Sequence, residues 1–173
     1  MAWMSADAAR IAGRGFFQSI AQDDLISELQ APIDGGWMIS DGATLLRAWR
    51  ESYFGDRSRF SEVVDYEVAV NGRGIPDMDL DSVGEVRVLR LLRRGVAFAW
   101  AALNRQHCEL PSIRMAAYVS VAPTLFDPAH FTGNVTFCTM GPGRPIYIDP
   151  ERTGNEIVVA LFTEDCEECV PKR

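Results

Sequence analysis

Two cysteines near the end of the chain, Cys166 and Cys169, have the spacing of a CxxC motif. Such a pair can contribute two ligands to a zinc ion or close a redox disulfide. Four acidic residues stand around the thiols at positions 164, 165, 167 and 168, and nearby negative charge raises a thiol pKa and removes the reactive thiolate. No second CxxC supplies the remaining zinc ligands. We therefore expect a solvated acidic tail, with Cys166 and Cys169 kept as candidate metal ligands.

Nucleophilic catalysis would need a thiol and an imidazole within hydrogen-bonding reach. The chain has two histidines, and His130 lies in a stretch with prolines and aromatic residues, between Asp127 and Cys138. The candidate catalytic residues are therefore His130, Cys138 and Asp127. Spacing alone does not show whether the three meet, and an exposed or locally bonded histidine is the alternative.

The run Asp77, Asp79, Asp81 resembles the beginning of a calcium-binding loop. Ser82 stands where that loop needs glycine, and Val88 where it needs glutamate, so we expect no calcium site of this type. The segment 56–85 contains eight acids and three arginines. It is either a solvated segment or, with Glu85, a docking surface for a basic partner.

Arginines follow this acidic segment at helical spacing. Arg87, Arg90 and Arg94 fall on one face of an expected helix. They could bind a phosphate or carboxylate ligand. The interpretation we favour is that they pair with the acids just before them.

The segment Trp37-Met38-Ile39-Ser40-Asp41-Gly42, followed by Leu46 and Trp49, resembles the HxxxDG segment of the CoA-dependent acyltransferase and condensation-domain superfamily. Residues Phe131-Thr132-Gly133-Asn134 are similar to a downstream turn of that superfamily. The resemblance implies acyl transfer with the motif histidine as the base. Trp37 occupies the histidine position, and an indole cannot accept a proton. The chain is also far shorter than such enzymes, so we expect no acyltransferase activity of this mechanism.

Composition excludes several other classes. The chain has 173 residues and a net charge of −7, with 47% hydrophobic residues. Nucleic acids and anionic membrane surfaces are bound by basic faces, so neither is expected as a partner. No apolar run approaches the ~20 residues of a membrane-spanning helix. Phosphate-binding glycine loops and the GxSxG elbow are missing from the sequence, and no cofactor is expected.

Periodicity predicts the elements that must position these residues. We expect an α+β fold as a single domain over 1–173, with N-terminal helices packed on a mostly antiparallel sheet formed largely by the C-terminal third. Turns are expected at 32–36 and at Asn71-Gly72, and Gly95 is expected to end or weaken the third helix. The expected helices are 6–29, split at its glycines, 41–54, and one beginning at a Ser82–Glu85 capping box. The expected strands are 63–70, 113–121, 134–139, 145–148 and 156–162.

Size, negative charge and the missing catalytic set favour a cytoplasmic binding protein, of the inhibitor, immunity or adaptor type, with a basic protein partner. The N-terminal residues do not resemble a secretory signal. The expected binding residues are Asp77, Asp79, Asp81, Glu85, Arg87, Arg90 and Arg94. The alternative is a small enzyme or ligand-binding domain whose site lies around His130 and Cys138. The oligomeric state is left open.

Overall fold

A five-stranded antiparallel sheet forms the centre of the structure, a computed structural model that describes residues 1–142, 147–149 and 153–172. The strand order is β1–β7–β5–β6–β4. The three long strands come from the C-terminal part of the chain, which confirms the predicted α+β fold. They are β5 (Met115–Pro123), β6 (Phe131–Thr139) and β7 (Ile157–Phe162), and the short edge strands are β1 (Trp3–Met4) and β4 (Gly72–Gly74).

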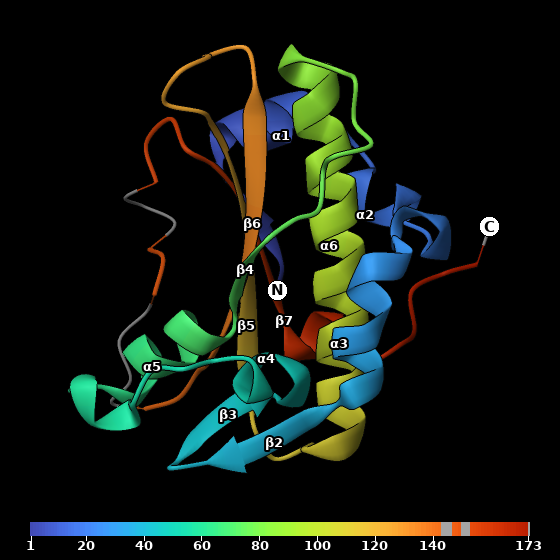
Figure 1. The fold of residues 1–173 in the computed structure, drawn as a ribbon. Helices are drawn as coiled ribbons and strands as arrows, with labels where there is room; N and C mark the ends of the chain where they lie inside the picture. Colours follow the sequence, from blue (N-terminus) through green and yellow to red (C-terminus); the bar gives the residue numbers. More distant parts are fainter. Residues whose placement is uncertain (143–146, 150–152, 173) are drawn as a thin grey trace.

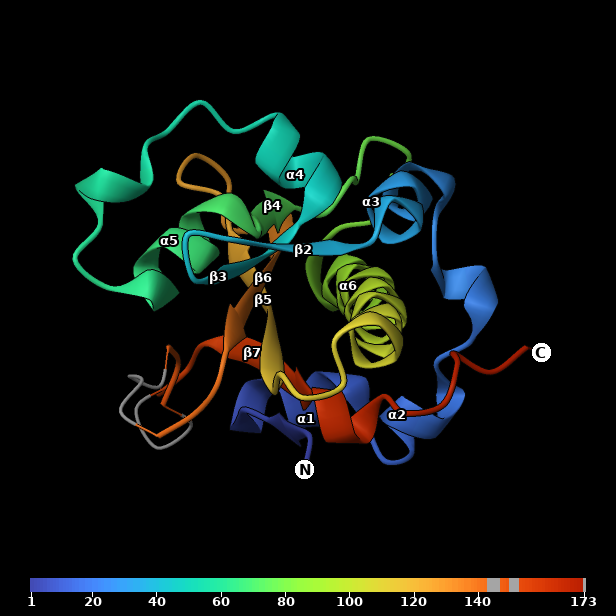
Figure 2. The same ribbon diagram turned by 90° about the horizontal axis from the view of Figure 1, so that it is seen from below.

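One face of this sheet is covered by a single long helix, α6 (Gly84–Glu109), which runs along the strands (Figure 1). Figure 2 shows α6 nearly end-on, with α1 (Ala6–Ala12) and α3 (Gln30–Gly35) on different sides of it. The short helix α2 (Phe16–Ser19) lies between them in sequence. The main hydrophobic core fills the space between α6 and the sheet and includes Leu91, Phe98, Val119 and Phe137.

Among the described residues, the second face of the sheet is covered by α5 (Val63–Val70) and by Met140, Tyr147 and Ile148. Helix α5 packs through Val64 on Ala116, Tyr118 and Cys138, and Figure 1 shows the upper ends of β5 and β6 rising above it. A two-stranded hairpin, β2 (Trp37–Ser40) and β3 (Ala43–Leu46), lies at the lower end with α4 (Arg47–Glu51).

The prediction of a strand over 63–70 is wrong, because this segment is α5. Helical spacing places Glu67 and Asn71 on one buried face. The Glu67 carboxylate accepts hydrogen bonds from the backbone N–H of Thr44 at 2.8 Å and of Thr139 at 2.7 Å. The Asn71 amide accepts from Leu46 N–H and donates to the Thr44 carbonyl. Asn71 therefore caps α5 instead of forming a hairpin turn with Gly72.

The expected turn at 32–36 and helix at 41–54 are also wrong. Helix α3 continues to Gly35, and the chain reverses instead at Asp41 and Gly42, which have φ of 53° and 76°. Two consecutive residues with positive φ form the tight turn that twisted hairpins prefer. Only 47–51 of the expected second helix is helical.

The first predicted helix breaks at its glycines into α1 and α2, as anticipated, but its continuation over 20–29 is wrong, because that stretch forms only the short 3-10 segments Gln22–Asp24 and Ser27–Leu29. The Ser82–Glu85 capping box does not form, because α6 begins at Gly84 and Glu85 instead binds Arg10. The predicted strand at 145–148 falls partly on residues outside the described ranges, and Tyr147 and Ile148 form a bend. None of the described helices is both long and apolar enough to cross a bilayer.

Gly95 neither ends nor interrupts α6, which continues to Glu109. A Cβ at this position would stand 2.5 Å from Val119 Cγ1 and 2.6 Å from Ile75 Cδ1, closer than packed carbon atoms approach. The missing side chain therefore lets the helix backbone lie directly against β5.

We predict that Gly95→Ala lowers the free energy of unfolding by about 1–2 kcal/mol, because the overpacking cost exceeds the gain in helix propensity. Chemical denaturation measures this change. Gly141→Ala is the control, since a Cβ there meets no atom within 4 Å, and it should leave stability nearly unchanged. A Gly95→Ala protein as stable as the wild type would contradict the tight contact.

Candidate functional site

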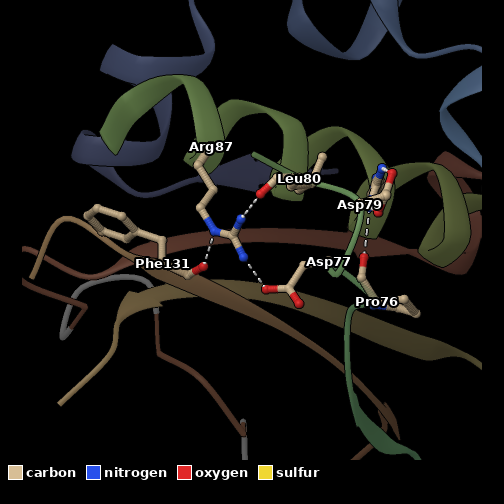
Figure 3. A network of polar contacts seen from close by, with 7 residues as sticks. Pro76, Asp77, Asp79, Leu80, Arg87 and Phe131 are labelled. Atoms are coloured by element: carbon tan, nitrogen blue, oxygen red, sulfur yellow. Dashed lines mark hydrogen bonds and ion pairs between the residues drawn. The ribbon is translucent and has the colours of Figure 1, made fainter. Parts of the chain in front are cut away.

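The acidic segment predicted as a docking surface is joined to α6 through Arg87. This guanidinium is 2% exposed and donates to the carbonyls of Leu80 and Phe131, each at 2.6 Å, and to the carboxylate of Asp77. Figure 3 shows the three acceptors converging on it. A buried cation needs such partners, so Asp77 and Arg87 hold the segment 77–80 and the beginning of β6 against the helix.

Asp79 and Arg94 form a second ion pair. Arg94 stands about two turns of α6 beyond Arg87. The Arg94 guanidinium donates to Asp79 Oδ1 at 2.7 Å and to the Pro76 carbonyl at 2.9 Å. The hydrogen bond from Arg94 to Asp79 is the main reason that the pKa of Asp79 falls from the usual 3.8 to about 2. The favoured interpretation, that these arginines pair with the preceding acids, is confirmed for Arg87 and Arg94.

Arg90 is exposed at a cavity of about 390 Å³ beside these pairs. Arg93 and Asp24 line the same cavity and bind each other, at 2.7 Å between Nη2 and Oδ2. Three arginines and three aspartates surround it, so its charges cancel. Of the remaining predicted binding residues, Glu85 binds Arg10 at 2.5 Å and Asp81 is exposed.

The structure does not bring His130 and Cys138 together. They stand at opposite ends of β6, eight residues apart, which is roughly 27 Å along an extended strand. Cys138 is buried beneath α5 next to Tyr118. The pKa of Tyr118 is raised to about 12, mainly by burial and secondly by the Cys138 thiol. His130 and Asp127 are neighbours, but the hydrogen bond between them runs from the backbone N–H of His130 to the backbone carbonyl of Asp127, so it involves no imidazole atom.

The two CxxC cysteines have different environments. Cys166 is buried, and its pKa is raised first by burial and then by the charges of Asp165 and Glu164. Cys169 is exposed, and its thiol lies 3.5 Å from the side-chain oxygen of Asn104. Across the described part of the chain, no group of three potential ligand side chains is placed to hold a metal ion.

Of the residues in the superfamily resemblance, Trp37, Leu46 and Trp49 belong to the core. Trp37 begins β2, and its indole N–H donates to the Ala102 carbonyl of α6 at 2.9 Å. Its ring packs edge-on against Phe137. The residues Phe131 to Asn134 form the start of β6 and not a turn.

A surface that sequence reasoning did not single out lies at the loop 124–130 between β5 and β6. Leu125 and Phe126 are 98% and 99% exposed there. The loop is closed by hydrogen bonds from Thr124 N–H to the His130 carbonyl at 2.8 Å and from Ala129 N–H to Asp127 Oδ1 at 2.9 Å. The Thr124 hydroxyl adds a third, to the Asp127 carbonyl. The sequence feature that could have predicted this surface is the pair of large apolar residues, Leu125 and Phe126, shortly after Pro123.

A groove of about 480 Å³ adjoins this loop. Its walls are the end of β5, including Ser120, Ala122 and Pro123, and the residues around the beginning of β7, including Asn155 and Glu156. Glu156 is the charged residue among those that line it. The loop and the groove together form the candidate site.

No protein-family model, curated protein or solved structure matches this chain. The interpretation of its surfaces therefore depends on their geometry and chemistry.

The Asp79–Arg94 pair predicts a specific titration. In Arg94→Gln, the pKa of Asp79 should return from about 2 toward 3.8, as carboxyl NMR shifts would show. Because the folded-state pKa is the lower one, the pair stabilises the fold fully above pH 3.8 and loses this effect as the pH falls through about 2. An Asp79 pKa that is the same in both proteins would contradict the pairing.

The cysteine environments predict two classes of thiol. Cys108 and Cys169 are exposed, whereas Cys138 and Cys166 are buried. At neutral pH, an aromatic disulfide reagent should react quickly with two thiols of the folded protein and with all four after denaturation. Single Cys108→Ser and Cys169→Ser variants should each remove one fast thiol. Rapid reaction of Cys138 or Cys166 in the folded chain would be inconsistent with this structure.

Proposed function

We propose that the chain is a cytoplasmic binding protein that docks onto a protein partner through the β5–β6 loop. The observation that carries the proposal is the nearly complete exposure of Leu125 and Phe126, two consecutive residues of that loop. Covering a side chain of this size contributes about 1.5–3 kcal/mol. Two such residues in water are typical of a contact surface.

The loop is also closed by its own hydrogen bonds. Its backbone is held by the bonds of Thr124 with His130 and of Ala129 with Asp127. A loop that already has its bound shape loses little conformational entropy on association. His130 and Asp127 thus support the proposal as residues that shape the loop.

The charge around the loop favours a basic partner. Asp127 is exposed within the loop, and the exposed Glu156 lines the adjoining groove. The net charge of the whole chain is −7, which speeds encounter with a positively charged surface. The acids at 77 and 79 support the fold through their arginines, so we assign the contact to the loop instead of that segment.

The test is affinity capture from an extract of the source cells with the full chain as bait. The Leu125→Ser, Phe126→Ser double variant should lose a partner that the wild type retains, because its apolar contact is gone. Phe54→Ser is the matched control, since Phe54 is equally exposed outside the loop. Binding should also weaken at high salt.

A partner retained equally by the double variant would refute the loop assignment. Loss of binding in both the double variant and Phe54→Ser would point to general hydrophobic adhesion instead. Circular dichroism of each bait shows that the fold is intact.

A further inference from the structure

We propose that the groove beside the loop receives an extended segment of the partner in which a basic side chain stands next to an apolar one. This inference rests on the proposed function and adds to it the chemistry of the bound segment. It is carried by the part of the sheet that α5 leaves uncovered, by the polar side chains there and by Glu156.

The part of the sheet beyond α5 presents exposed side chains of β5 and β6 on one face. Ser120 pairs with Asn134 and Ala122 pairs with Thr132 in the β5–β6 register. Cross-strand partners project to the same face of a sheet, here the face that α5 covers only lower down, at Ala116 and Tyr118. Ala122, Thr132 and Asn134 are exposed. The adjoining groove of about 480 Å³ falls within the range of ligand sites.

The polar side chains around the groove offer hydrogen bonds that the chain itself does not use. Within the described ranges, Ser120, Asn134 and Asn155 have no side-chain hydrogen bond to another residue. A serine hydroxyl and an asparagine amide each donate and accept. An extended peptide presents N–H and C=O groups in alternation along its length, so one backbone can satisfy these side chains together.

The charge of the groove selects a cation. Glu156 is its charged lining residue, it is exposed, and no described residue forms an ion pair with it. A lysine or arginine of the bound segment would form a charge-assisted hydrogen bond with this carboxylate. Ala122 and Pro123 lie in the same groove, and Leu125 and Phe126 follow them in the loop, so the neighbouring position of the segment is apolar.

The experiment selects random linear peptides, displayed on phage, for binding to the immobilised full chain. Enriched peptides should share a Lys or Arg beside an apolar residue. A selected peptide is then titrated by fluorescence anisotropy against three proteins. Glu156→Gln should weaken its binding about two- to fivefold, because the amide keeps an acceptor oxygen but loses the charge attraction of an exposed pair. Glu51→Gln, the matched control at the end of α4, should leave its affinity unchanged.

Failure to enrich any peptide overturns the inference. So does enrichment without basic residues, or equal affinity for the wild type and Glu156→Gln. Equal weakening by Glu156→Gln and Glu51→Gln also overturns it, because the cation would then respond only to the net charge. The capture experiment with the loop variant is a separate readout. If that variant loses its partner while no basic peptide is selected, the proposed function stands and this inference fails.

Discussion

The close approach of α6 to β5 at Gly95 is the constraint on which the structure depends. The helix backbone lies against Val119 and Ile75 because no side chain separates them. At this distance the apolar face of α6 fills the core above the three long strands, with Phe98 meeting Phe137. The smaller N-terminal helices then pack around α6. A residue that ordinarily weakens a helix is required here, because packing outweighs helix propensity.

Buried polar side chains attach the outer segments to this central pair of elements. Arg87 holds the acidic segment through carbonyl groups and Asp77, and Glu67 joins α5 to the hairpin and to the end of β6. Each buried polar group must find partners to repay its desolvation. The expected binding residues Arg87 and Arg94 are therefore paired with acids of the same chain, and we place the candidate contact surface elsewhere.

The candidate contact surface lies at the end of the sheet, beyond the hydrophobic core, where the loop connects β5 to β6. The loop satisfies its own backbone and leaves two apolar side chains outside. The same strands carry Ser120 and Asn134 beyond the reach of α5. Rigid strands that present a short ordered loop are a common basis for recognition, and negative charge at Glu156 and Asp127 gives this one a preferred kind of partner.

The sequence by itself determined the α+β class, the three long strands, the first part of the long helix and the pairing of Arg87 and Arg94 with nearby acids, because periodicity and short spacing express these directly. Only the tertiary structure decided that 63–70 is a helix, that Asp41-Gly42 is a hairpin turn and that His130 and Cys138 lie far apart. The physical reason is that short segments have weak local preferences. Their conformation follows from what they bury, as Glu67 and Asn71 show through partners 23 to 72 residues away in the chain.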